Sequence, residues 1–134
     1  MSRLDETLGS VGFDNLINGA FPPAEVFSVT IRKEKAKAKT YKRGTVLALS
    51  AGTGGDGKLV ILGTGAGTSE TLTANCVLAE AVEVGTDSDA VAIAYRTGHF
   101  NSNGLIVADS HTFTAADKEA LRSAGILISD AVSY

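Results

Sequence analysis

The chain has 134 residues, of which 44% are hydrophobic and 6% aromatic, and it contains 15 glycines and no tryptophan. This length and composition predict one folded, β-rich domain with aliphatic side chains in its core and glycines in its turns. The net charge of −3 gives no overall attraction to nucleic acid, and no apolar stretch is long enough to span a membrane. The single cysteine, Cys76, excludes an internal disulfide and a cysteine-based zinc site, and we expect its thiol to be buried.

Residues 1–24 are expected to form an extended N-terminal arm. Their apolar side chains follow neither a helical nor a strand period, and a pair of prolines holds the end of the segment extended. Such a segment orders on a partner, although the sequence leaves open that it packs on its own domain. It carries no signal-peptide core, so we expect synthesis in the cytoplasm. The candidate contact residues of the arm are Phe13, Leu16, Ile17, Phe21, Pro22 and Pro23.

Residues 25–134 are expected to form a single β-rich domain. Residues 26–31 alternate as a strand does, and residues 44–50 and 59–63 predict a hairpin joined by a glycine turn. The small, polar stretch that follows predicts a loop at residues 63–75 with a short strand at 70–73. Further strands are expected at residues 76–84, 90–97 and 105–107, separated by turns at residues 85–89, 99–100 and 103–104.

Residues 32–43 form a basic run that contains seven of the twelve Lys and Arg residues and only one acid, Glu34, so that the rest of the chain is acidic. Lysines alternating with alanines are typical of an edge strand with one charged face, or of an extended loop. Six net positive charges could contact phosphates, which makes a polyanion- or nucleic-acid-binding module the alternative function. Because Tyr41 is its only aromatic residue and no recognition motif accompanies it, a solvated edge or an acidic protein partner is favoured. The basic residues are Arg32, Lys33, Lys35, Lys37, Lys39, Lys42 and Arg43.

One helix is predicted near the C-terminus. Thr114 is a good N-cap, and Asp117 stands three positions later, where a capping-box acid belongs. Gly125 supplies the C-terminal stop, and residues 126–128 then predict a buried strand. The inner face of the helix is expected to consist of Ala120, Leu121 and Ala124.

The motifs that could carry chemistry are weak. Residues 52–58 are glycine-rich and end in lysine, but Leu59 follows where a phosphate loop has Ser or Thr, and no helix begins there. His99 and His111 lie in expected turns without metal-ligand spacing, and no serine stands in a nucleophile elbow. We therefore predict no enzymatic activity, no catalytic residue, no metal site and no cofactor.

The order of these elements resembles that of the lambda-type phage head decoration proteins. The resemblance runs from about residue 41 to residue 129, through GTVLALS, CVLAEAVEV, AVAIAYRTGHF and LIVADSHTFTAADKEALRSAGILIS. It implies a mainly β fold, a β-clip-like small barrel or ribbon with one short C-terminal helix, preceded by the extended arm.

The resemblance also implies a function. It predicts a viral structural protein that binds the exterior of an expanded phage capsid as trimers at threefold sites, and that stabilises the shell against the pressure of the genome inside. The expected partners are the major capsid protein and two further copies of the chain. The expected location is the virion, and the contact with the shell falls by position on the arm at residues 1–24.

Overall fold

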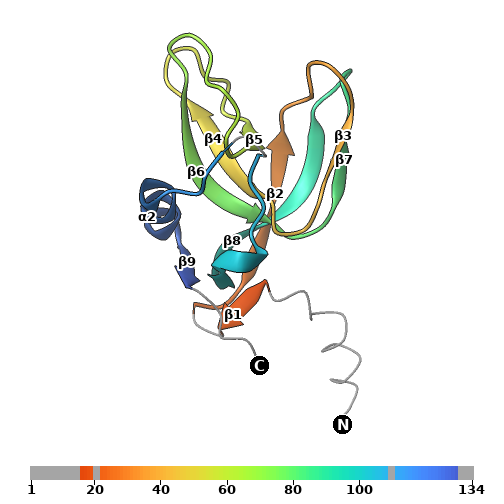
Figure 1. Ribbon diagram of the computed structural model, residues 1–134. Helices are drawn as coiled ribbons and strands as arrows, with labels where there is room; N and C mark the ends of the chain where they lie inside the picture. The colour runs from red at the N-terminus through yellow and green to blue at the C-terminus, as the bar shows by residue number, and fades with distance from the viewer. Residues whose placement is uncertain (1–15, 20–21, 109–110, 130–134) are drawn as a thin grey trace.

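The computed structural model describes residues 16–19, 22–108 and 111–129 (Figure 1). These residues form nine strands, one short 3-10 helix and one α-helix. In chain order they are β1 (Ile17–Gly19), β2 (Glu25–Ile31), β3 (Lys39–Tyr41), β4 (Val46–Ala51), β5 (Leu59–Ile61), β6 (Thr71–Leu78), β7 (Val82–Val84), β8 (Ala90–Asn101), η1 (Ser102–Gly104), α2 (Ala115–Ala124) and β9 (Ile126–Ser129).

Five strands close into a small barrel. The hydrogen-bonded order is β8, β2, β5, β4 and β6, and β6 pairs with β8 again to complete the ring. All of these pairings are antiparallel except the short parallel contact of β2 with β5. The predicted hairpin of β4 and β5 is confirmed. The expectation of a mainly β, small-barrel fold with one helix near the C-terminus is confirmed as well.

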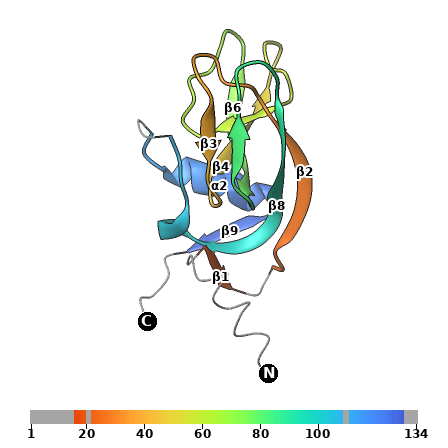
Figure 2. The ribbon, with the colours of Figure 1, turned by 90° about the vertical axis from the view of Figure 1, so that its right-hand side faces the viewer.

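Strand β8 is the central element and runs past the end of the barrel (Figure 2). Its first part pairs with β2 and β6, and its last residues pair with β1 on one side and with β9 on the other. The sequence-based expectation of a turn at residues 99–100 is therefore wrong. His99 and Phe100 stay extended because each is paired with β9 and with the N-terminal strand.

The predicted strand at residues 76–84 is in fact two strands. β6 begins at Thr71, in the short strand expected at residues 70–73, and ends at Leu78. The chain then leaves the barrel, and β7 pairs antiparallel with β3 in a separate two-stranded sheet, which forms one side of the upper part in Figure 1. The strand expected at residues 105–107 is reduced to an isolated bridge between Thr45 and Ile106.

Helix α2 begins and ends as predicted. The Thr114 side chain accepts a hydrogen bond from the Asp117 amide, and the Asp117 carboxylate accepts one from the Thr114 amide. Gly125 ends the helix in the left-handed region, with φ of 113°, and its amide donates to the last turn. Of the expected inner face, Leu121 is fully buried and Ala120 packs against the core, but Ala124 is exposed, because it stands at the end of the helix.

The core consists of two clusters of buried side chains. One lies under α2 and β9 and contains Leu16, Phe100 and Leu121, while the other lies inside the barrel around Leu47 and Cys76. Cys76 is buried as expected, and burial raises the pKa of its thiol to about 12. Within the described residues, no helix is long and apolar enough to cross a membrane.

Candidate interaction surfaces

The expected contact residues of the arm fall into three groups. Phe13 and Phe21 lie outside the described residues. Leu16 is only 1% exposed and belongs to the core cluster under α2, so this part of the segment packs on its own domain, as the alternative interpretation of the sequence allowed. Ile17, by contrast, is 45% exposed. The two neighbouring side chains thus point in opposite directions, as alternation along a strand requires.

Strand β1 is the edge of its sheet. It pairs with β8 through Ile17 opposite Phe100, and the Asn101 amide donates to the Leu16 carbonyl at 2.7 Å. Within the described residues no strand pairs with the other side of β1. An edge of this kind presents backbone donors and acceptors to a strand of another chain. β1 is therefore a candidate site for strand addition.

Pro22 and Pro23 lie in the segment that joins β1 to β2. Pro22 is half-buried and Pro23 is exposed, and the Pro23 carbonyl accepts a hydrogen bond from the Thr97 hydroxyl at 2.7 Å. The chain is thereby tied to β8 just before β2 begins. Pro22 and Pro23 remain predicted contact residues.

The basic run does not form one uniform surface. Arg43 is half-buried, where its guanidinium donates to the Tyr95 hydroxyl at 2.5 Å and to the Ala79 carbonyl and stacks over the Tyr95 ring. Arg32 is held by two carboxylates. The remaining basic residues of the run are exposed: Lys33, Lys35, Lys37, Lys39 and Lys42.

Arg32 is the centre of a hydrogen-bonded ion pair network. Its guanidinium binds both carboxylate oxygens of Asp56, at 2.9 and 3.0 Å, and one oxygen of Glu70 at 2.5 Å. Glu70 also accepts hydrogen bonds from the Ser50 hydroxyl and, at 2.7 Å, from the Gly67 amide. These donors favour the charged carboxylate. The Ser50 hydroxyl, then the Gly67 amide and then Arg32 lower the pKa of Glu70 to about 2.

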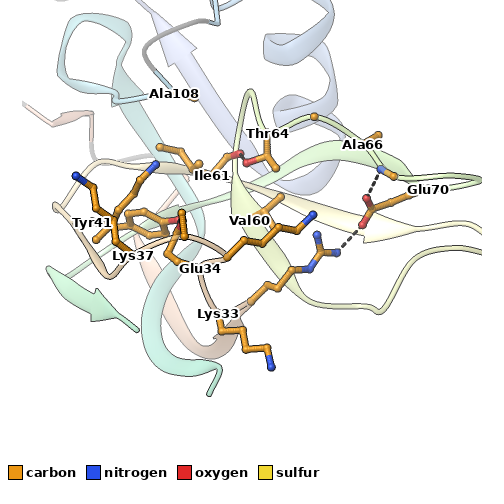
Figure 3. A pocket seen from close by; sticks show the side chains of 16 residues that line it. Lys33, Glu34, Lys37, Tyr41, Val60, Ile61, Thr64, Ala66, Glu70 and Ala108 are labelled. Carbon is orange, nitrogen blue, oxygen red and sulfur yellow. Dashed lines mark hydrogen bonds and ion pairs between the residues drawn. The ribbon is translucent and has the colours of Figure 1, made fainter. Parts of the chain in front are cut away.

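A groove of about 750 Å³ separates the basic run from the loop that follows β5 (Figure 3). Four exposed lysines, Arg32 and Glu34 line one side, and Thr64 to Gly67 line the other. The Tyr41 hydroxyl donates to Glu34, and burial together with this carboxylate raises the pKa of Tyr41. Val60, Ile61 and Ala108 supply apolar lining between the walls. We call this site the lysine groove.

The histidines take part in local hydrogen bonds. His99 Nε2 lies 2.8 Å from the Ser129 hydroxyl, in β8 rather than in the expected turn, and His111 Nε2 lies 2.7 Å from an oxygen of Asp117 beside the helix cap. In the part of the chain that the structure describes, no three potential metal ligands come together.

The sequence indicated only one wall of the lysine groove. It identified the basic run by its composition, but the opposite wall belongs to a loop that was expected to be a simple connection. Loop residues 64–67 follow the basic run by more than twenty positions, and only the pairing of β2, β5 and β4 brings the two together. No local sequence signal could have shown this.

Acid is expected to destabilise the Glu70 network. Because the pKa of Glu70 is about 2 in the folded protein and ordinarily 4.5, the unfolded chain binds the proton first. The stabilising contribution of Glu70 is thus complete above about pH 4.5 and is lost as the pH falls toward 2. Glu70→Gln removes this contribution, so the melting temperature of the variant, followed by circular dichroism, should depend less on pH across that interval.

Glu83→Gln is the matched control. Glu83 is exposed, and within the described residues its side chain forms no hydrogen bond or ion pair, so this variant should follow the wild-type pH profile. The melting temperature should still fall with pH in both variants, because Arg32 also lowers the pKa of Asp56. Parallel profiles for Glu70→Gln and the wild type would contradict the network.

Comparison with known proteins gives one clear relationship. No curated protein matches the chain. A family model, described as bacteriophage lambda head decoration protein D, matches residues 22–127, which include the whole barrel, α2 and the start of β9. The family consists of structural proteins of the phage head, which gives this protein a capsid-associated structural role. Since the match covers most of its length, the chain belongs to the bacteriophage lambda head decoration protein D family.

Proposed function

We propose that this protein binds the exterior of an expanded phage capsid, as trimers at threefold sites, and stabilises the shell against the pressure of the packaged genome. Its partner in this role is the major capsid protein, and its location is the outer surface of the virion. Family membership supports the capsid association. The observation that carries the mode of contact is the edge strand β1, which exposes Ile17 and directly continues the segment at residues 1–15.

Strand addition explains how such a contact would select an expanded shell. An arm that extends a capsid sheet binds only where a strand edge is accessible, and backbone hydrogen bonds then supply affinity while alternate side chains supply specificity. In this proposal Phe13, Ile17, Phe21 and the two prolines contact the shell. Leu16 is left out because its side chain is part of the protein's own core.

Binding to the assembled lattice stabilises it by mass action. A ligand that binds the assembled state and not the free subunits lowers the free energy of the assembly, and many copies multiply the effect. Three arms joined in one trimer act together, because the binding of one raises the effective concentration of the others at the shell. A modest affinity of each arm for the shell is therefore sufficient to hold the trimer in place.

Deletion of residues 1–15 is expected to weaken binding to the shell while leaving the domain folded, because it removes Phe13 but keeps β1. The deletion stops before Leu16, which the core requires. Expanded shells that lack the protein are mixed with the intact or the shortened chain and sedimented, and the bound copies are counted. Saturable binding of the intact chain, weakened on deletion, is the expected result.

Two point variants refine this experiment. Phe13→Ser with Phe21→Ser should weaken shell binding, whereas Ile106→Ser, a change of an exposed apolar residue in the loop after η1, should leave the arm contact intact. Circular dichroism checks that each variant is folded. Failure of the intact chain to bind any shells would refute the proposed function.

A further inference from the structure

The lysine groove carries an excess of positive charge that the groove itself does not neutralise. Arg32, Lys33, Lys35, Lys37 and Lys39 line it, against the carboxylates of Glu34 and Glu70. Both carboxylates are already engaged, Glu70 by Arg32, Ser50 and Gly67, and Glu34 by the Tyr41 hydroxyl. Within the described residues, the side chains of Lys35, Lys37 and Lys39 form no ion pair.

The opposite wall of the groove offers backbone donors. Gly65 and Ala66 are exposed, and in the part of the chain that the structure describes their amides donate to no protein acceptor. A Cβ atom added at Gly65 would meet nothing within 4 Å, so another backbone can approach closely. With apolar lining from Ile61, Ala36 and Ala66, the groove suits an extended, acidic segment that also carries aliphatic side chains.

Nucleic acid fits this site poorly. Single strands bind to grooves in which aromatic side chains stack on the bases, and the one aromatic residue of the groove, Tyr41, is only 6% exposed. The guanidinium of Arg32, which could grip a phosphate with two hydrogen bonds, is already bound by Asp56 and Glu70. An acidic protein segment is the better occupant.

The protein itself exposes a segment of this kind. Around β7, Ala81 and Val82 lie between Glu80 and Glu83, and Asp87 follows the strand. All three carboxylates are exposed and form no ion pair with any described residue. Within the described residues β7 pairs only with β3, so no described strand pairs with its second edge. Beside it Val91 is 72% exposed and borders, with Ala81 and Val82, a shallow hollow of about 140 Å³. We call Glu80, Ala81, Val82, Glu83, Asp87 and Val91 the acidic edge.

We propose that the lysine groove of one copy binds the acidic edge of a second copy of this chain. The charges of the two surfaces are complementary, and each adds apolar area, as interfaces between subunits do. In a trimer each copy turns its lysine groove toward one neighbour and its acidic edge toward the other, so the contact is head-to-tail. A head-to-tail contact that closes produces a ring. The inference thus rests on the proposed trimer and assigns the surfaces that join its subunits.

Charge reversal tests this pairing. Lys35→Glu with Lys37→Glu, and separately Glu80→Lys with Glu83→Lys, should each weaken association of the copies more than about tenfold, because like charges then face each other. The variant that carries all four substitutions exchanges the two signs and should regain association. Lys42→Glu with Lys118→Glu is the matched control, since it changes the net charge as much as the first pair but touches neither surface. Association is measured by sedimentation velocity at rising protein concentration, and again on expanded shells, where copies are held close together.

A zero-length carbodiimide cross-linker identifies the contact directly, since it joins a lysine to a carboxylate that already touches it. We expect cross-linked dimers and trimers whose peptides join Lys35 or Lys37 of one copy to Glu80 or Glu83 of another. Shell binding without such cross-links, or cross-links from these lysines to the capsid protein, would overturn this inference alone. Protection of the same lysines by an oligothymidine, and not by a second copy, would also overturn it, in favour of a polyanion site. The absence of any shell binding would instead refute the proposed function.

Discussion

Leu16→Ala is expected to lower the free energy of unfolding by about 2–5 kcal/mol, the usual range for removing a fully buried leucine side chain. Leu16 is 1% exposed, and its carbonyl accepts the Asn101 amide, so the side chain fastens the N-terminal strand to the core. Ile17→Ala, one residue further on, should cost less than about 1 kcal/mol, because nearly half of that side chain is exposed. Urea unfolding followed by circular dichroism measures both.

The same pair of variants separates folding from shell binding. If β1 contacts the capsid, Ile17→Ala should reduce the number of copies bound to expanded shells without loss of stability. Leu16→Ala should reduce stability, and its effect on shell binding should disappear at a temperature where the variant is fully folded. A stability change near zero for Leu16→Ala would mean that the segment does not dock on its own domain and that all of residues 1–24 act as an arm.

The elements that the sequence predicted well are those fixed by local interactions. The cap of α2 needs only Thr114, Asp117 and Gly125, all within one helix length, and the structure has each in the expected role. The hairpin of β4 and β5 is likewise local, since a glycine turn joins two apolar strands. The burial of Cys76 followed from its place in an apolar run.

The elements that were mispredicted depend on distant partners. His99 and Phe100 were expected in a turn, but they stay extended in β8 because β1 and β9, from opposite ends of the chain, pair on either side. The run from Cys76 to Val84 looks continuous, yet it divides, since β6 completes the barrel and β7 pairs with β3. Pairings between residues far apart in the chain leave no mark on local composition.

The same reasoning applies to the interaction surfaces. The basic run was visible as a cluster of seven charges. Its division was not visible, because Arg32 is bound by acids in two distant loops and Arg43 by a tyrosine in β8. Only the exposed lysines remain for binding. The acidic edge was visible only in part, since Glu80 and Glu83 lie in an expected strand and Asp87 lies in the expected turn that follows it.

Phe100→Ala should be the most destabilising single change, with an expected loss of about 3–5 kcal/mol. Phe100 is fully buried, its ring lies 5.1 Å from that of Tyr95, and it packs against the backbone of Gly98 closely enough that a Cβ atom there would come within 2.7 Å of the ring. Val91→Ala, in the same strand but largely exposed, is the control and should remain within about 0.5 kcal/mol of the wild type. A loss below about 1 kcal/mol for Phe100→Ala would restore the sequence-based expectation that the strand ends before this residue.

Combining Phe100→Ala with Leu16→Ala tests how the N-terminal segment is held. The two residues share one buried cluster, and Phe100 is the register partner of Ile17, the neighbour of Leu16. Side chains in one cluster are coupled, so the double variant should differ from the sum of the single ones by about 0.5–3 kcal/mol. Additive losses would mean that the two side chains act independently. Coupling would mean that the extension of β8 and the docking of β1 are one cooperative unit, so that the edge offered to the capsid is built by the domain's own core.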